Sequence, residues 1–227
     1  MIPVLFEQDD LIVIDKPEGV ASIPTRKPGE ETVLSLLSLQ CKERLFIVHR
    51  LDKEVSGVML FAKSAAAHKN QNDQFFNRTI KKTYTLLAHG SVAADSGIIN
   101  RPLRQFGSGR MGVDQKSGKE SITAYDVLDR RAGFSLVSAY PRTGRRHQIR
   151  VHLYSIGHPI AGDVRYGDKG KQELFPRLML HASKIVFSLP SGVEKIVTSS
   201  LPESFTKVLT GAGWDEDTVS SFEERFL

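Results

Sequence analysis

The stretch IVHRLDKEVSGVMLFAKS at residues 47–64 decides the fold class of this chain. Its apolar runs, at 46–49 and 57–63, flank the polar segment RLDKEVS. Short apolar runs bounded by polar residues predict buried strands. The polar segment is therefore expected to form a loop that presents Arg50 and Asp52 between two strands. Taken alone, this carboxylate beside a guanidinium is best explained as a surface ion pair, because such pairs are common and weak.

The flanking segments predict another strand and two helices. LIVID at 11–15 is an apolar run typical of a buried strand. A helix is predicted to begin after Thr32, which is a suitable N-cap before an apolar pattern at helical spacing. A second helix is predicted over 64–79, with Phe75 and Phe76 facing the core.

From Lys82 onward the sequence is typical of β structure. Three segments of alternating character, separated by turn residues, predict antiparallel strands at 82–90, 119–130 and 134–141. Between the first two lies a glycine-rich basic stretch, residues 101–119, whose only acid is Asp114. This stretch is predicted to be a mobile basic loop or an extended hairpin.

The remaining segments complete a single-domain prediction. Residues 147–157 predict a helix that ends at a glycine, and two short strands at 184–189 and 194–199 precede a C-terminal helix from Pro202. The sequence contains no internal repeat and no low-complexity linker. Residues 1–227 are therefore expected to form one α/β (α+β) domain dominated by a mainly antiparallel or mixed sheet.

Composition and charge narrow the class of protein. The 227 residues are 40% hydrophobic and 25% charged, which are ordinary globular proportions. The net charge is +5, and residues 1–210 carry +9 because five acids lie in the last 17 residues. This charge suits a polyanionic partner without requiring one. The single Cys41 excludes an intramolecular disulfide and points to a reducing cytoplasm, and no apolar run approaches the ~20 residues that span a bilayer.

Several motifs that could carry chemistry are rejected on context. GSGRMG at 107–112 matches the dinucleotide-binding pattern, but no strand precedes it and no helix follows it. Histidines 147, 152 and 158 lie close together in sequence, yet five helical residues rotate a side chain by about 500°, so the first two face ~140° apart. Without nearby cysteines or carboxylates a metal site is not expected. These histidines are instead expected to cap the helix, hydrogen-bond in the core or touch phosphate.

A second basic cluster favours an anion. The segment TGRRHQIR at 143–150 places arginines at a predicted helix N-terminus, where cations oppose the helix dipole unless an anion is bound. Phosphate is the natural anion for such a cluster. The arginines concerned are Arg142, Arg145, Arg146 and Arg150.

The opening stretch resembles the catalytic motif of the RluA-type family of RNA pseudouridine synthases, H-R-L-D-x-x-T-S-G. Four further segments are similar to family motifs in the family's order, and with the first they span residues 10–190, about four fifths of the chain. Val55 departs from the usual threonine, and Arg146 departs from the usual threonine or serine. The further segments are DLIVIDKPEGV (10–20), KKTYTLLAHG (81–90), PRTGRRHQIRVHLYSIGHPIAGDVRYG (141–167) and LMLHASKIVFSLP (178–190).

The resemblance implies a pseudouridine synthase fold, with a central, mainly antiparallel sheet and helices around it, and isomerisation of uridine to pseudouridine in RNA without cofactor or metal. It implies that Asp52 is the essential carboxylate, which attacks C1′, adds to the uracil ring or acts through a glycal. It implies that Arg150 pairs with that carboxylate and that Tyr84 stacks on the target base and assists removal of the C5 proton. Arg50 would fill the space of the extruded uridine.

The RNA partner is expected to be a structured stem-loop of ribosomal or transfer RNA. The chain is expected to be a monomer that has a catalytic domain and no S4 domain, because the family pattern already begins near Asp10. The candidates for RNA contacts are Lys81, Lys82, Arg104, Arg110, Arg145, Arg146 and His147. Two alternatives stay open: an RNA-binding or RNA-chaperone protein that forms no product, and a metal-dependent hydrolase that uses the histidines.

Overall fold

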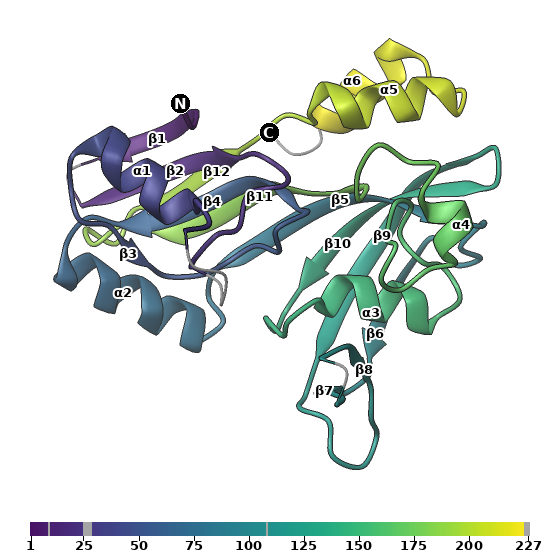
Figure 1. Ribbon diagram of the computed structural model, residues 1–227, viewed down its shortest axis with the longest axis horizontal. Helices are drawn as coiled ribbons and strands as arrows, with labels where there is room; N and C mark the ends of the chain where they lie inside the picture. The colour runs from purple at the N-terminus through teal and green to yellow at the C-terminus, as the bar shows by residue number, and fades with distance from the viewer. Residues whose placement is uncertain (9, 25–28, 108, 225–227) are drawn as a thin grey trace. The chain divides into compact units, whose positions relative to one another are not determined.

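The computed structural model describes residues 1–8, 10–24, 29–107 and 109–224 (Figure 1). The chain divides into two compact units. The first contains Met1–Lys82 and Ala182–Ser200, and the second contains Thr83–His181 and Leu201–Leu227. Strands β5 (Lys81–His89) and β11 (Leu180–Ser188) each run from one unit into the other.

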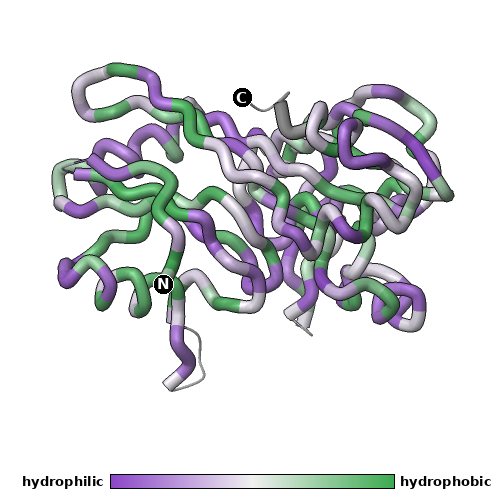
Figure 2. The backbone as a smooth tube through the Cα atoms, turned by 90° about the horizontal axis from the view of Figure 1, so that it is seen from above, coloured by the Kyte–Doolittle hydropathy of each residue, from purple (hydrophilic) through white to green (hydrophobic). Residues whose placement is uncertain are grey.

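The first unit is built on strands in the order β1-β2-β4-β11, with β3 beside β4 and β12 beside β11. Neighbours β2 and β4 are antiparallel, from the pair Leu11↔Ala62 to the pair Lys16↔Gly57. Long hydrophobic stretches, drawn green in Figure 2, run through this unit. They form a core that includes Val13, Leu60 and Phe187. The bounds are β1 Val4–Gln8, β2 Leu11–Lys16, β3 Phe46–Ile47, β4 Ser56–Ala62 and β12 Glu194–Thr198.

Two helices complete the first unit, and both begin where the sequence predicts. In α1 (Val33–Cys41) the Thr32 side chain accepts a hydrogen bond from the Ser35 backbone N–H, and the Ser35 side chain accepts one from the Thr32 N–H. In α2 (Ala65–Phe76) the Ser64 hydroxyl accepts from the Ala67 N–H. These two caps satisfy N–H groups that the first turn of a helix leaves unpaired.

One prediction about α2 is wrong. Phe75 packs against the core of the first unit, whereas the side chain of Phe76 is 86% exposed. Ala67, Gln71 and Phe75 follow one another at intervals of four residues and form the inward face. The next residue is rotated by about 100° from that face, and at the last position of α2 this rotation carries the Phe76 side chain into solvent.

The second unit has strands in the order β5-β10-β9-β6. Strand β10 pairs antiparallel with β5 and with β9, as the alternating sequence pattern predicts. Helix α3 contacts β9 and β10, and α5 packs on α6. The bounds are β6 Ser96–Asn100, β9 Ile122–Arg131, β10 Phe134–Pro141, α3 Gln148–Ser155, α4 Lys169–Gln172, α5 Glu203–Gly211 and α6 Glu216–Glu224.

The basic stretch 101–119 forms a hairpin, which is one of its two predicted conformations. Strand β7 (Leu103–Gln105) pairs antiparallel with β8 (Met111–Val113). Met111 belongs to a small hydrophobic cluster with Leu103, Val151 and Tyr166. The hairpin is therefore attached to α3 and to the segment around Tyr166 by a core of its own.

The predicted fold class, a mixed α/β chain with a mainly antiparallel sheet, is confirmed. The sequence prediction omits strands β1 and β6, and it makes β3 four residues long where the structure has two. Within the described residues, no helix combines the length and the apolar character needed to cross a membrane.

Candidate active site

Asp52 lies in the loop between β3 and β4, where the sequence places it. Its side chain is partly exposed, Arg50 before it is exposed, and Leu51 between them is buried. The Ser22 hydroxyl accepts a hydrogen bond from the Leu51 N–H at 3.1 Å and donates one to the Leu51 carbonyl at 2.7 Å. Leu51 is thus held through both of its backbone polar groups. This fixes the backbone from which the Arg50 and Asp52 side chains project.

A fully buried lysine holds the other side of this loop. The Lys16 side chain has 0% exposure, and its ammonium donates to the carbonyl of Val55 at 2.7 Å, of Pro17 at 2.8 Å and of Lys53 at 3.2 Å. A buried cation is tolerated only when its hydrogen bonds are made. Lys16 therefore ties the residues that follow Asp52 to the end of β2.

His49, just before the Arg50–Asp52 segment, is a structural residue. Its Nε2 accepts the Leu60 N–H at 2.9 Å, and its ring stacks on Phe75 with ring centroids 5.0 Å apart. Burial, and secondarily the charge of Lys82, lowers the pKa of His49 to about 3. The ring is therefore neutral at neutral pH and serves as an acceptor that links the loop to β4.

Lys82, near the start of β5, has surroundings that lower its pKa. Its ammonium lies 5.8 Å from the centre of the Phe75 ring, and burial lowers its pKa to about 8. The neighbouring Lys81 is exposed. Alternation along the strand puts Lys82 and Tyr84 on one face, and Tyr84 is partly exposed opposite Ala139 of β10.

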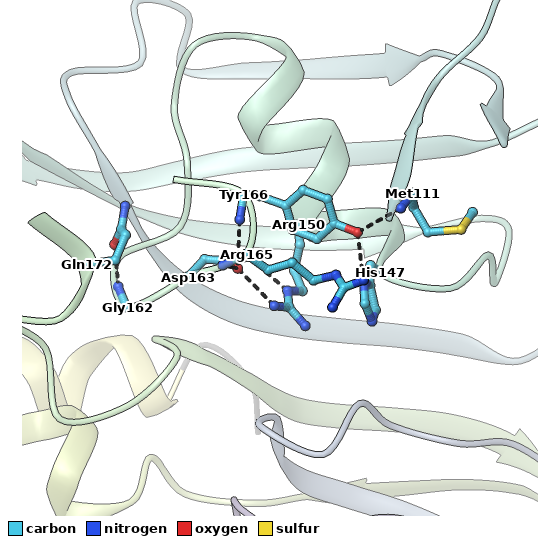
Figure 3. Close-up of polar contacts among 8 residues, drawn as sticks. All are labelled: Met111, His147, Arg150, Gly162, Asp163, Arg165, Tyr166 and Gln172. Atoms are coloured by element: carbon cyan, nitrogen blue, oxygen red, sulfur yellow. Dashed lines mark hydrogen bonds and ion pairs between the residues drawn. The ribbon is translucent and has the colours of Figure 1, made fainter. Parts of the chain in front are cut away.

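In the second unit, Arg150 is buried in a bidentate ion pair with Asp163 (Figure 3). Its Nε donates to Oδ2 and its Nη2 to Oδ1, each at 2.8 Å, and the two side chains are 3% and 0% exposed. Two parallel hydrogen bonds fix both the position and the plane of a guanidinium. Asp52 belongs to the first unit and Arg150 to the second, so their pairing stays a prediction.

His147 and Tyr166 form a second set of contacts around Arg150. The centre of the Tyr166 ring lies 5.3 Å from the Arg150 guanidinium carbon. The Tyr166 hydroxyl accepts the Met111 N–H at 3.2 Å and lies 2.7 Å from Nδ1 of His147 (Figure 3). His147 is the N-cap of α3 in a left-handed backbone conformation and makes no side-chain cap. It is therefore bound within the protein through one ring nitrogen.

The predicted phosphate-binding arginines of the second unit differ in their surroundings. Arg104 pairs with Asp114 at 3.0 Å and lies over the Phe106 ring, whereas Arg110 lies over the rings of Tyr154 and Tyr166. Arg145 donates from Nε to the Glu120 carbonyl at 3.1 Å. Arg146 is exposed.

His152 hydrogen-bonds in the core, which is one of the roles that the sequence leaves open for the histidines. It is fully buried, with Nδ1 2.8 Å from the Thr123 hydroxyl and Nε2 3.0 Å from the Arg101 carbonyl. Desolvation lowers its pKa. It is a hydrogen-bonded core residue. In the described part of the chain, no three histidine, cysteine, aspartate or glutamate side chains are grouped as a metal site requires.

Sequence reasoning missed the residues that hold the candidate side chains. Lys16 and Ser22 hold the Asp52 loop, and Asp163 and Tyr166 hold Arg150. A signal was present for the last two, because GDVRY at 162–166 places an acid and an aromatic after the arginine-rich stretch 142–150 and its helix. Lys16 gave no such signal, since a lysine at the end of an apolar strand is ordinarily exposed.

Comparisons with known proteins agree with the motif resemblance. The family described as RNA pseudouridylate synthase matches residues 10–155. The uncharacterized RNA pseudouridine synthase YlyB of Bacillus subtilis is 33% identical over 218 residues, covering 92% of this chain and 72% of that protein. The ribosomal large subunit pseudouridine synthase C of Vibrio cholerae is 34% identical over 216 residues, covering 90% of this chain and 69% of that protein.

Two solved human structures are similar over nearly the whole chain. RNA pseudouridylate synthase domain containing 1 superposes with a TM-score of 0.78 at 25% identity, covering 99% of this chain and 95% of that one. RNA pseudouridylate synthase domain containing 4 gives a TM-score of 0.76 at 27% identity, covering 92% of each chain. The similarity therefore extends through both units.

Proposed function

This chain belongs to the family of RNA pseudouridylate synthases, and on that premise we propose that Asp52 is the carboxylate with which it converts specific uridines of RNA to pseudouridine. Its class is that of an isomerase acting on RNA. The observation that supports the assignment of residues is the family match over 10–155, which includes Asp52, Tyr84 and Arg150. The RNA is proposed to be ribosomal or transfer RNA, modified by a monomer in the cytoplasm.

The reaction exchanges one bond for another within the nucleotide. The bond from N1 of uracil to C1′ breaks, the ring turns, C5 bonds to C1′, the C5 proton is released and N1 gains a proton. Cleavage at C1′ develops positive charge on the sugar, which a carboxylate stabilises or traps. A partly exposed Asp52 on a loop held by Lys16 and Ser22 suits this task, because its side chain is accessible to a substrate and the backbone that carries it is fixed.

Arg150 is proposed to pair with Asp52 and keep it ionised. Asp163 engages the Nε and Nη2 atoms of Arg150, which form one edge of the guanidinium. A guanidinium presents a second edge, Nη1 with Nη2, that can serve another carboxylate. One arginine can therefore be held by Asp163 and act on Asp52 at the same time.

Tyr84 is proposed to stack on the target base and to assist removal of the C5 proton. The base must leave its stack before Asp52 can reach C1′, and the exposed Arg50 is proposed to occupy the space that it leaves. The remaining contacts are proposed to be with phosphate and sugar, from Lys81, Lys82, Arg104, Arg110, Arg145, Arg146 and His147.

The proposed contact of Lys82 predicts a pH dependence of RNA binding. Because burial lowers its pKa to about 8, Lys82 is charged at neutral pH and loses its charge as the pH rises through that value. Since about four fifths of the charge is lost between about pH 7 and about pH 9, we expect the salt slope of RNA binding to fall by about 0.6 to 0.7 over this range. The measurement is fluorescence anisotropy of a labelled RNA stem-loop titrated over a range of salt concentrations at each pH.

The matched control is Lys82→Arg, because arginine stays charged over this range. Its salt slope should be independent of pH, and the difference between the two proteins removes any titration of the RNA itself. Equal pH dependence in both proteins would show that Lys82 does not contact phosphate.

The function itself is tested by mapping pseudouridine in total RNA from cells with and without this gene. We expect discrete sites to disappear from the mutant, and the pure protein to restore them on a short stem-loop of matching sequence. RNA affinity without product at any site would instead support an RNA-binding or RNA-chaperone role.

A further inference from the structure

We propose that Asp163 and Tyr166 are positioning residues for Arg150, and that the segment joining them also fixes the basic β7–β8 hairpin to the same place. The proposal rests on the proposed role of Arg150 and adds the two residues that orient its guanidinium. Neither residue is assigned a contact with RNA or with the reacting atoms.

The carboxylate of Asp163 is itself held before it holds Arg150. Oδ1 accepts the backbone N–H groups of Arg165 at 3.1 Å and of Tyr166 at 3.2 Å, in addition to the Nη2 of Arg150. Residues 163–166 thus form a short turn whose backbone N–H groups hold the Asp163 carboxylate. Both side chains of the ion pair are almost completely buried, so water does not compete for these bonds. The guanidinium plane is consequently set by the backbone of the segment 163–166.

The Tyr166 ring restricts Arg150 from a second direction. It lies 5.3 Å from the guanidinium carbon, is 1% exposed and belongs to the cluster of Leu103, Met111 and Val151. Its hydroxyl is tied to the Met111 N–H and to His147. Figure 3 shows the carboxylate and the ring both directed at Arg150. An arginine contacted by a carboxylate and by an aromatic ring has little freedom left.

The same segment contacts the tip of the hairpin. Arg165 donates to the Gly109 carbonyl at 3.1 Å, and the Arg110 guanidinium carbon lies 5.1 Å from the Tyr166 ring. Gly162, before Asp163, has a φ of +77°, and a Cβ there would collide with the Arg177 backbone. The start of the segment is therefore fixed against its neighbour, and the hairpin and Arg150 depend on one short stretch of chain.

A double-mutant cycle separates positioning from general stability. The variants are Asp163→Asn, Arg150→Met and the two combined, with Asp95→Asn as control, because Asp95 pairs with Arg130 in the same unit but is 87% exposed. The assay is single-turnover tritium release from total RNA labelled with [5-³H]uridine and isolated from cells lacking this gene. RNA affinity and thermal unfolding are measured alongside, and all rates are taken well below each unfolding midpoint.

We expect Asp163→Asn to slow tritium release roughly 100-fold, the loss typical of a misplaced catalytic group, with RNA affinity unchanged. In the Arg150→Met background Asp163→Asn should cause no further loss, because Asp163 acts only through Arg150. The control should react at the wild-type rate. Should Asp163→Asn not fold, Asp163→Glu keeps the charge, displaces the carboxylate by one methylene and carries the same expectations.

Four results would overturn the proposal. A folded Asp163 variant at the wild-type rate, together with a slow Arg150→Met, would overturn the positioning role alone. Losses that multiply in the double variant would show that Asp163 acts independently of Arg150. A wild-type rate for Arg150→Met would overturn the proposed role of Arg150 and this inference with it. No tritium release by the wild-type protein would overturn the proposed function as well.

Discussion

Asp52→Asn is expected to abolish pseudouridine formation, with the single-turnover rate reduced by roughly 10⁴-fold or more, as is typical when the central group of a catalytic set is removed. Asparagine has the shape of aspartate without its charge, so it can neither trap nor stabilise the positive sugar. The measurement is tritium release from RNA labelled at C5 of uridine, followed by nuclease digestion and quantitation of pseudouridine.

The fold should tolerate this change, because Ser22 and Lys16 hold the backbone on both sides of Asp52. The Ser22 hydroxyl hydrogen-bonds to the backbone of Leu51, and the Lys16 ammonium donates to the carbonyls of Lys53 and Val55. Thermal unfolding and RNA affinity should therefore stay close to those of the wild-type protein. The matched control is Asp73→Asn on the exposed face of α2 in the same unit, which should react normally. Turnover by Asp52→Asn at more than a few per cent of the wild-type rate would remove Asp52 from the mechanism.

Local sequence rules account for most elements of this fold. Thr32 and Ser64 begin α1 and α2 as predicted, because an N-cap depends on residues only three positions apart. Strands β5, β9 and β10 of the second unit follow from alternation, which reports directly on a half-buried sheet. Strand β1 was missed because its residues are mostly exposed and leave no buried run to recognise. Phe76 is exposed because it lies off the inward face of α2 at the last residue of that helix, which an apolar pair of residues does not reveal.

The candidate side chains were found by motif, whereas the groups that hold them were not. Asp163 lies 13 positions after Arg150 and is brought to it by the turn that follows α3. Ser22 reaches Leu51 across 29 positions, and Lys16 reaches Val55 across 39. Such pairings depend on how distant segments meet, which single-residue patterns do not encode. A buried lysine runs against its usual exposure, so only the structure reveals it.

Lys16→Met is expected to destabilise the protein by roughly 2 to 4 kcal/mol, because it removes the charged donor to three carbonyls, of which that of Val55 is buried. Methionine fills a similar volume and removes the ammonium, so the loss reports on the contacts of the ammonium, among them those to Val55, Pro17 and Lys53, rather than on a cavity. The measurement is urea unfolding followed by circular dichroism.

The matched control is Lys53→Met in the same loop. The Lys53 ammonium is exposed and pairs only with Glu30 among its described contacts, so the unfolding midpoint of this variant should stay near that of the wild-type protein. Because Lys16 also fixes the chain that follows Asp52, the folded fraction of Lys16→Met should form pseudouridine slowly while still binding RNA; normal stability together with a normal rate would show that the loop is held without it.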